Sequence, residues 1–105
     1  MTYKWNKLAE DVFLTAVEYT AMEYGKNIAE KFIDKVDSTV NLIAGHPIIG
    51  KIEWQLSHRK HEYRSLVVDE HYKLVYYINS KKLRIVIADM WDTRQNPFKL
   101  TRRLK

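Results

Sequence analysis

The residues best suited to chemistry in this chain are four polar side chains of its C-terminal half. Arg64 and Lys73 stand in neighbouring segments with strand character, and we expect them to face outward together. His71 lies two residues before Lys73, and Arg94 follows the last apolar segment. Cations can stabilise developing negative charge in a transition state, and the imidazole of histidine can move protons near neutral pH. The predicted catalytic set is therefore Arg64, Lys73, Arg94 and His71.

Two of these residues also have a purely structural interpretation. Arg94 could pair with Asp92 or Asp89 and pin the chain end to the domain. His71 could be an ordinary turn residue at the start of a strand. The sequence leaves these interpretations open beside the catalytic one.

A second group of residues is suited to binding a nucleic acid or another anionic target. Its members are Tyr77 and the tail cations Lys99, Arg102 and Arg103. Aromatic rings beside cations can stack on bases, and clustered cations contact phosphates. We predict that these four residues contribute to target binding.

The charge distribution points in the same direction. Residues 1–45 hold five Lys or Arg against seven Asp or Glu, a net charge of −2, whereas residues 46–105 hold thirteen against six, a net charge of +7. Such asymmetry is typical of proteins with a polyanionic or acidic partner, although a well-solvated basic surface would give the same count.

Several classes of site have no support in the sequence. The chain has no cysteine, which excludes disulfides, thiolate metal sites and a cysteine nucleophile. His58 and His61 form a His-x-x-His pair, but no Glu lies between them and no third ligand follows at a set spacing. No glycine-rich phosphate loop and no Gly-x-Ser-x-Gly motif occurs. We expect neither a metal nor a cofactor.

The elements that must position these residues can be read from periodicity. Residues 3–5 are a short strand candidate, and an apolar stripe at helical spacing predicts a helix from about Lys7 that stops at Gly25. A second stripe predicts a helix that begins near Asn27 and ends before Gly45. Two helices joined by a glycine turn form an antiparallel hairpin. Residues 45–60 are expected to be a loop.

Three segments rich in β-branched and aromatic residues then predict an antiparallel meander over residues 63–68, 72–78 and 83–90. Alternation in the middle strand turns one set of side chains toward the helices: Tyr72, Leu74, Tyr76 and Ile78. In the preceding strand Tyr63, Ser65 and Val67 are expected to point inward. The expected fold is α+β: one domain over 1–105 with a basic tail at 99–105. A helical hairpin packs on one face of a mostly antiparallel four-stranded sheet, whose other face is concave and basic.

The N-terminal residues carry Lys4 and Lys7 but no apolar block after them. We therefore expect neither a secretory signal nor a membrane-spanning helix, and we expect no membrane partner. A chain without cysteine also suits a reducing compartment, so the expected location is the cytoplasm.

The order of these pieces resembles the RelE/ParE superfamily of bacterial toxins. The resemblance covers nearly the whole chain and rests on pieces whose order and spacing agree with that superfamily: Ala29 and Phe32, Pro47 with Gly50, Tyr63-Arg64, the run Tyr72 to Tyr77, and the run Asp92 to Pro97. It implies a toxin of a type II toxin–antitoxin pair, held inactive by a cognate antitoxin. Exposed aromatic rings could then pack against apolar side chains of the antitoxin as readily as they could stack on bases.

The resemblance leaves two mechanisms open. RelE-like members cut messenger RNA in the ribosomal A site without a metal, and Arg94 falls at a position similar to their phosphate-contacting arginine. ParE-like members poison DNA gyrase and are not nucleases. Leu66 stands where RelE-like chains carry a second strand cation, and Phe98 and Leu100 replace a C-terminal tyrosine or histidine, which favours gyrase. The overall basicity favours an mRNA endoribonuclease, and a non-toxic antitoxin-binding adaptor is a third hypothesis.

Overall fold

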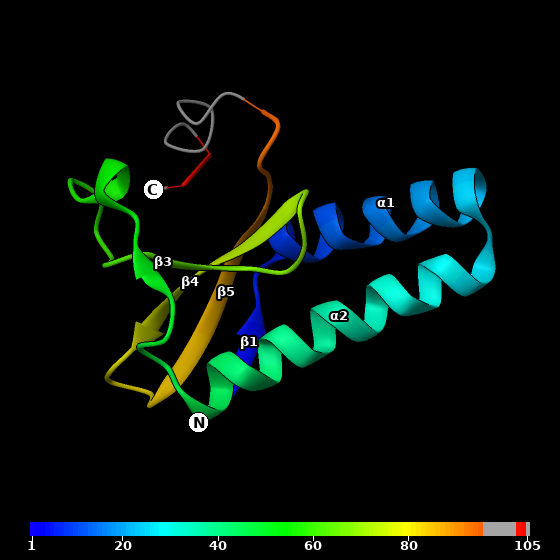
Figure 1. Cartoon of the computed structure of the whole chain (residues 1–105). Coiled ribbons are helices and arrows are strands. Elements are labelled where there is room, and N and C mark those ends of the chain that lie inside the picture. Colours follow the sequence, from blue (N-terminus) through cyan, green and yellow to red (C-terminus); the bar gives the residue numbers. More distant parts are fainter. Residues whose placement is uncertain (96–102, 105) are drawn as a thin grey trace.

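The computed structural model describes residues 1–95, 103 and 104 and shows an α+β fold. Helices α1 (Lys7–Tyr24) and α2 (Lys26–Gly45) run side by side as a hairpin, and its far end projects beyond the sheet (Figure 1). The strands and one short 3₁₀ turn are β1 (Thr2–Trp5), β2 (Lys51–Ile52), η1 (Trp54–Leu56), β3 (Arg64–Val67), β4 (Tyr72–Asn79) and β5 (Arg84–Asp92). The predicted fold class is confirmed.

Gly25 alone separates the two helices. Its φ of 94° lies in a region that side chains with a Cβ rarely adopt, and its N–H donates to the carbonyl of Ala21 at 3.0 Å. The predicted stop of the first helix is therefore confirmed, and the second helix begins one residue earlier than Asn27. Neither helix of the described chain has the combination of length and apolar character that crossing a membrane requires.

The sheet has the strand order β1-β5-β4-β3-β2. β1 pairs in parallel with β5, and all other neighbours are antiparallel. The fifth strand, β2, lies in the segment that was expected to be a loop. It has only two residues, Lys51 and Ile52, so no alternating pattern could announce it.

The main core lies between the helices and the sheet. Leu74, Tyr76 and Ile85 are completely buried there against Phe32 and Val36 of α2. Tyr72 packs on this core, and its ring centroid lies 5.6 Å from that of Phe32. These contacts confirm the predicted orientation of the middle strand.

The predicted faces of β3 are wrong. Arg64 pairs with Tyr76 and Leu66 pairs with Leu74, and directly paired residues share a sheet face, so these two side chains lie on the helix side. Ser65 and Val67 lie on the opposite side. Both sets of residues in this short strand contain apolar side chains, which is why alternation alone did not distinguish them.

The sheet face away from the helices is not open along its whole length. A second core covers part of it and consists of Leu56, Tyr63, Val75, Ala88, Trp91 and Leu104. Residues 54–63 supply the cover that a bare meander would lack. The expectation of an open, concave and basic face is therefore wrong in this region, where Trp91 is buried.

Candidate functional site

The structure separates Arg64 from Lys73. Arg64 lies opposite Tyr76 on the helix side of the sheet, whereas Lys73 pairs with Val67 on the other side. The prediction that these two cations face outward together is therefore wrong. The cause is the orientation of β3, in which each side chain lies on the opposite face of the sheet from the expected one.

Lys73 is held in a buried ion pair. Its Nζ lies 2.5 Å from Oε1 of Glu53, a side chain that is only 3% exposed, and the hydroxyl of Ser65 donates to the same oxygen at 2.5 Å. Burial alone would raise the pKa of Glu53, but the hydrogen bonds from Lys73 and Ser65 outweigh it and hold this pKa below its ordinary value. Lys73 thus neutralises a buried carboxylate.

Arg64 closes a loop onto the sheet. Its Nη1 donates to the carbonyl oxygens of Gly50 at 2.9 Å and Ile48 at 3.3 Å, and its Nη2 lies 3.4 Å from Glu62. Most of the side chain is covered. These contacts give Arg64 a structural role in anchoring the segment before β2.

Arg94 forms a two-point ion pair with Asp92. Its Nε and Nη2 donate to the two carboxylate oxygens at 2.9 and 2.8 Å, and its backbone N–H donates to the same group at 2.9 Å. The hydrogen bond from Arg94 lowers the pKa of Asp92. Of the two structural interpretations, pairing with Asp92 is the correct one. The guanidinium is nevertheless more than half exposed.

His71 and Arg94 are the two predicted catalytic residues that the structure brings together. The N–H of Thr93 donates to the carbonyl of His71 at 2.8 Å, which ties the start of β4 to the residue before Arg94. Both side chains line a cavity of about 360 Å³ whose wall includes Tyr19 and Tyr24 of the first helix. His71 also lies 3.5 Å from Glu70.

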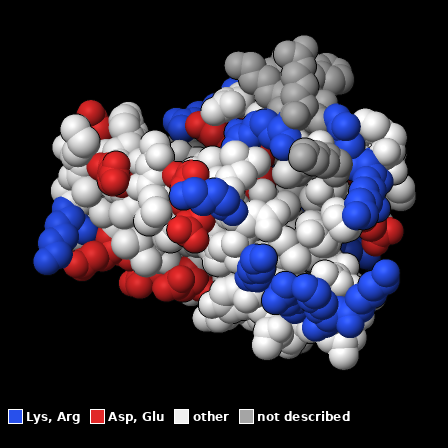
Figure 2. All heavy atoms as spheres, turned by 180° about the vertical axis from the view of Figure 1, so that it is seen from behind, with Lys and Arg blue, Asp and Glu red and all other residues white. Residues whose placement is uncertain are grey.

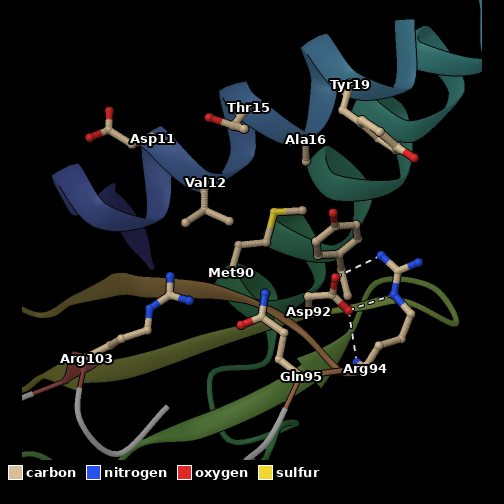
Figure 3. A pocket seen from close by; sticks show the side chains of 11 residues that line it. Asp11, Val12, Thr15, Ala16, Tyr19, Met90, Asp92, Arg94, Gln95 and Arg103 are labelled. Atoms are coloured by element: carbon tan, nitrogen blue, oxygen red, sulfur yellow. Dashed lines mark hydrogen bonds and ion pairs between the residues drawn. The ribbon is translucent and has the colours of Figure 1, made fainter. Parts of the chain in front are cut away.

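A second cavity of about 470 Å³ lies between α1 and the end of β5 (Figure 3). Val12 and Ala16 point toward it from the helix, and the Asp92–Arg94 pair lies opposite (Figure 3). Tyr19 and Arg94 line both cavities, so the two cavities adjoin each other, and we refer to them together as the groove along the hairpin. The walls of the groove are mainly apolar and carry an ion pair between them, so the groove can receive an extended or helical peptide with apolar side chains.

Arg103, which was predicted to bind a target, lies against the sheet. It donates to the completely buried Asp89 at 2.8 Å, and its guanidinium lies 5.1 Å from the ring centre of Trp91. Leu104 is buried beside it. Burial raises the pKa of Asp89 to about 6, although Arg103 and the N–H of Met90 act in the opposite direction. These contacts hold the chain end on the sheet.

Asp89→Asn is expected to change how stability depends on pH. The folded state binds this proton more tightly than the unfolded state, because burial raises the pKa from 3.8 to about 6. The contribution of Asp89 to stability is therefore fully present below pH 3.8 and falls by roughly 3 kcal/mol as the pH rises through about 6. In urea denaturation, the free energy of unfolding of the asparagine variant should therefore rise relative to that of the unsubstituted protein as the pH increases across this range. A difference that stays constant with pH would contradict this assignment.

Tyr77 is half-buried and stacks on His61, with ring centroids 3.7 Å apart and planes 3° apart. Burial lowers the pKa of His61, and Lys60 lowers it further. Lys99 and Arg102, also predicted to bind a target, lie outside the described residues.

Sequence reasoning missed the two buried carboxylates. Asp89 interrupts the apolar run from Ile85 to Trp91, and an acid in such a run is a signal for a buried pair that could have been used. Glu53 lies in an irregular segment and gave no signal. Tyr19 and Tyr24 of α1 are exposed in the structure, which the apolar stripe of this helix did not indicate.

Comparisons with known proteins agree with this architecture. A family model described as the ParE toxin of the type II toxin–antitoxin system parDE matches residues 3–97. A solved structure, the chromosomal ParDE system from P. aeruginosa, superposes with a TM-score of 0.68 at 15% identity and covers 88% of this chain and 95% of that chain. A search of curated proteins finds no match. The structural similarity shows the fold alone, but the family model spans most of the sequence. The chain therefore belongs to the ParE toxin family of type II toxin–antitoxin systems.

Proposed function

We propose that this toxin arrests growth by binding DNA gyrase and trapping it on DNA, without cutting RNA. The observation that carries the proposal is the separation of Arg64 and Lys73 by the sheet. Cleavage of a phosphodiester without a metal requires cations that converge on one phosphate. Two of the three predicted cations cannot meet, because they lie on opposite faces.

The remaining charges are already engaged. Lys73 neutralises Glu53, and Arg94 neutralises Asp92. A cation paired with a carboxylate offers less stabilisation to a dianionic transition state than a free one, because the carboxylate opposes the developing charge. A toxin that acts by binding a protein target does not need such a site.

The family assignment also supplies a cognate antitoxin as partner. We infer that its extended or helical segment covers the groove along the hairpin. Large apolar side chains are exposed at the far end of the hairpin, namely Tyr19, Met22, Tyr24 and Ile28. Exposed apolar rows of this kind mark protein interfaces. Tyr24 and Ile28 border the cavity that also contains His71 and Arg94.

Messenger RNA cleavage remains a second candidate, because one observation favours it. His71 and Arg94 line the same cavity, so a proton-transfer group and a half-exposed guanidinium adjoin one space. In that mechanism Arg94 would leave Asp92 to contact the phosphate.

The two mechanisms make opposite predictions for purified components. With gyrase and supercoiled plasmid, the toxin should produce linear DNA after the protein is denatured, because trapped cleavage complexes release broken ends. With programmed ribosomes it should leave the messenger intact. A double variant, His71→Ala with Arg94→Ala, should retain the gyrase effect within about threefold, since trapping of gyrase as proposed requires neither proton transfer nor a phosphate contact in the toxin.

Cut messenger together with loss of activity in the double variant would overturn the proposal in favour of the nuclease. Induction in bacteria gives an independent check: gyrase poisoning should cause filamentation and DNA damage before translation falls. Normal growth would favour the antitoxin-binding adaptor.

A further inference from the structure

We propose that the end of the sheet around the β4–β5 turn binds the phosphate backbone of duplex DNA. Four cations define this surface, which we call the basic end: Lys4, Lys81, Lys82 and Arg84. None of them belongs to the predicted catalytic set or lines the groove described above. The basic end is therefore a separate binding surface.

The strand register brings these cations together from two distant segments. Lys4 of β1 pairs with Val86 of β5, and Arg84 pairs with Thr2. Arg84 and Val86 alternate with Ile85, which is buried in the main core, so Arg84 and Lys4 both point away from the helices. Neighbouring strands are only about 5 Å apart. Lys4 and Arg84 are thus close neighbours on one face, beside the turn that carries the two other lysines.

Acidic side chains do not neutralise the basic end. The sequence has no Asp or Glu between Glu70 and Asp89. Within the described residues, none of the four cations forms an ion pair, in contrast to Lys7, Lys26 and Lys73. Figure 2 shows Lys and Arg gathered at the end of the molecule away from the hairpin, while Asp and Glu collect over the hairpin. This end therefore has a positive potential that attracts a polyanion.

The β4–β5 turn holds its lysines in a defined conformation. The side-chain oxygen of Asn79 accepts a hydrogen bond from the backbone N–H of Lys82 at 3.2 Å. Leu83 adopts a φ of 52°, a left-handed value that is uncommon for residues other than glycine and fixes the return into β5. Cations on a preorganised turn lose less conformational freedom on binding than cations on a flexible segment.

A duplex fits this surface better than a single strand does. On the sheet face that carries Lys4 and Arg84, the ring of Tyr77 adjoins the basic end through the pairing of Tyr77 with Val86, and His61 already covers one face of this ring at 3.7 Å. Single-stranded nucleic acids are held largely by bases that stack on free aromatic rings, whereas the duplex backbone is bound by cations through its phosphates. Because His61 and Tyr77 stack on each other, this surface favours contacts with the phosphate backbone of a duplex over stacking with the bases of a single strand.

This inference deepens the proposed function and takes its biological meaning from it, because a toxin that traps gyrase on DNA would meet both partners. DNA binding can be measured without gyrase, so the two proposals can fail separately. If the toxin produced linear plasmid with gyrase but did not bind DNA directly, only this inference would be overturned. If the toxin bound DNA directly but had no effect on gyrase, only the proposed function would be overturned.

The test is a titration of the full chain into a fluorescent duplex of mixed sequence at several salt concentrations. The variant Lys4→Gln with Lys81→Gln and Lys82→Gln changes only exposed side chains, and circular dichroism checks its fold. Its affinity should fall at least roughly tenfold, and the slope of log Kd against log salt should fall by about 2 to 3. Arg84 is left in place because its Nε is buried.

A matched control separates the site from the net charge. Lys26→Gln with Lys31→Gln and Lys35→Gln removes three exposed lysines from α2 and should leave both affinity and salt slope close to those of the unsubstituted chain. If the two triple variants lost the same amount of DNA affinity, the inference would be overturned, because binding would then depend only on the net charge of the protein. Tighter binding to a single-stranded RNA or DNA of the same sequence would overturn the choice of a duplex.

Discussion

Gly50→Ala is expected to lower the free energy of unfolding by roughly 3 kcal/mol. A Cβ at this position would lie 2.6 Å from Oη of Tyr76 and 2.8 Å from the carbonyl oxygen of Ser65. Tyr76 cannot move away, because it is completely buried, accepts a hydrogen bond from the N–H of Gly50 at 2.9 Å and donates to the carbonyl of Pro47 at 2.8 Å. Relief of the clash therefore breaks this network or displaces β3. Urea denaturation measures the loss.

Gly45→Ala is the control for this substitution. Gly45 is the last residue of α2, and a Cβ there would meet nothing within 4 Å. Alanine is the better helix former, so stability should stay the same or rise by a few tenths of a kcal/mol. If both alanine variants were equally stable, the close packing of Gly50 on Tyr76 would be wrong.

Lys73→Ala should have an effect of similar or larger size, roughly 3 to 5 kcal/mol, because it leaves the buried Glu53 without its partner. Acidification should distinguish this cause from lost packing. In the unsubstituted protein the pKa of Glu53 is lowered, so its contribution is present above the ordinary value and lost as the pH falls through the lowered one. In the variant, burial still raises the pKa of Glu53, and Lys73 is no longer present to lower it. Its stability relative to the unsubstituted protein should therefore recover as the pH falls.

Lys73→Met with Glu53→Gln provides the matched comparison. This pair removes both charges and keeps side chains of similar length, so most of the stability lost in Lys73→Ala should return. A double variant as unstable as Lys73→Ala would show that packing around the lysine stem matters more than the ion pair. Denaturation of all three proteins at neutral pH decides between these outcomes.

The elements that could be predicted from the sequence are those in which local signals agree. Gly25 interrupts two apolar stripes and has the positive φ that its type allows. In β4, alternation placed Leu74 and Tyr76 toward the helices, and both are completely buried there. Agreement between period, capping and turn residues is what made these assignments correct.

The candidate site could be predicted less well, because its geometry depends on a short strand. β3 has four residues, and a shift of one residue in its register moves Arg64 to the other face of the sheet. That register is fixed by contacts far away in the sequence, such as the Gly50 carbonyl that accepts from Arg64. The partners of Lys73 and Arg103 are likewise set by tertiary packing, which no local pattern contains.

The end of β5 has a further consequence for the behaviour of the free protein. β1 pairs with β5 only from Arg84 to Ile87, so the rest of this long strand lacks a strand neighbour on that side within the described residues. The N–H of Met90 is nevertheless occupied, since it donates to the carboxylate of Asp89 at 2.8 Å. Residues 88–91 are also buried, so this end of β5 offers no open edge to the strands of other molecules. Asp89 thus satisfies a backbone donor that no neighbouring strand of the described chain reaches.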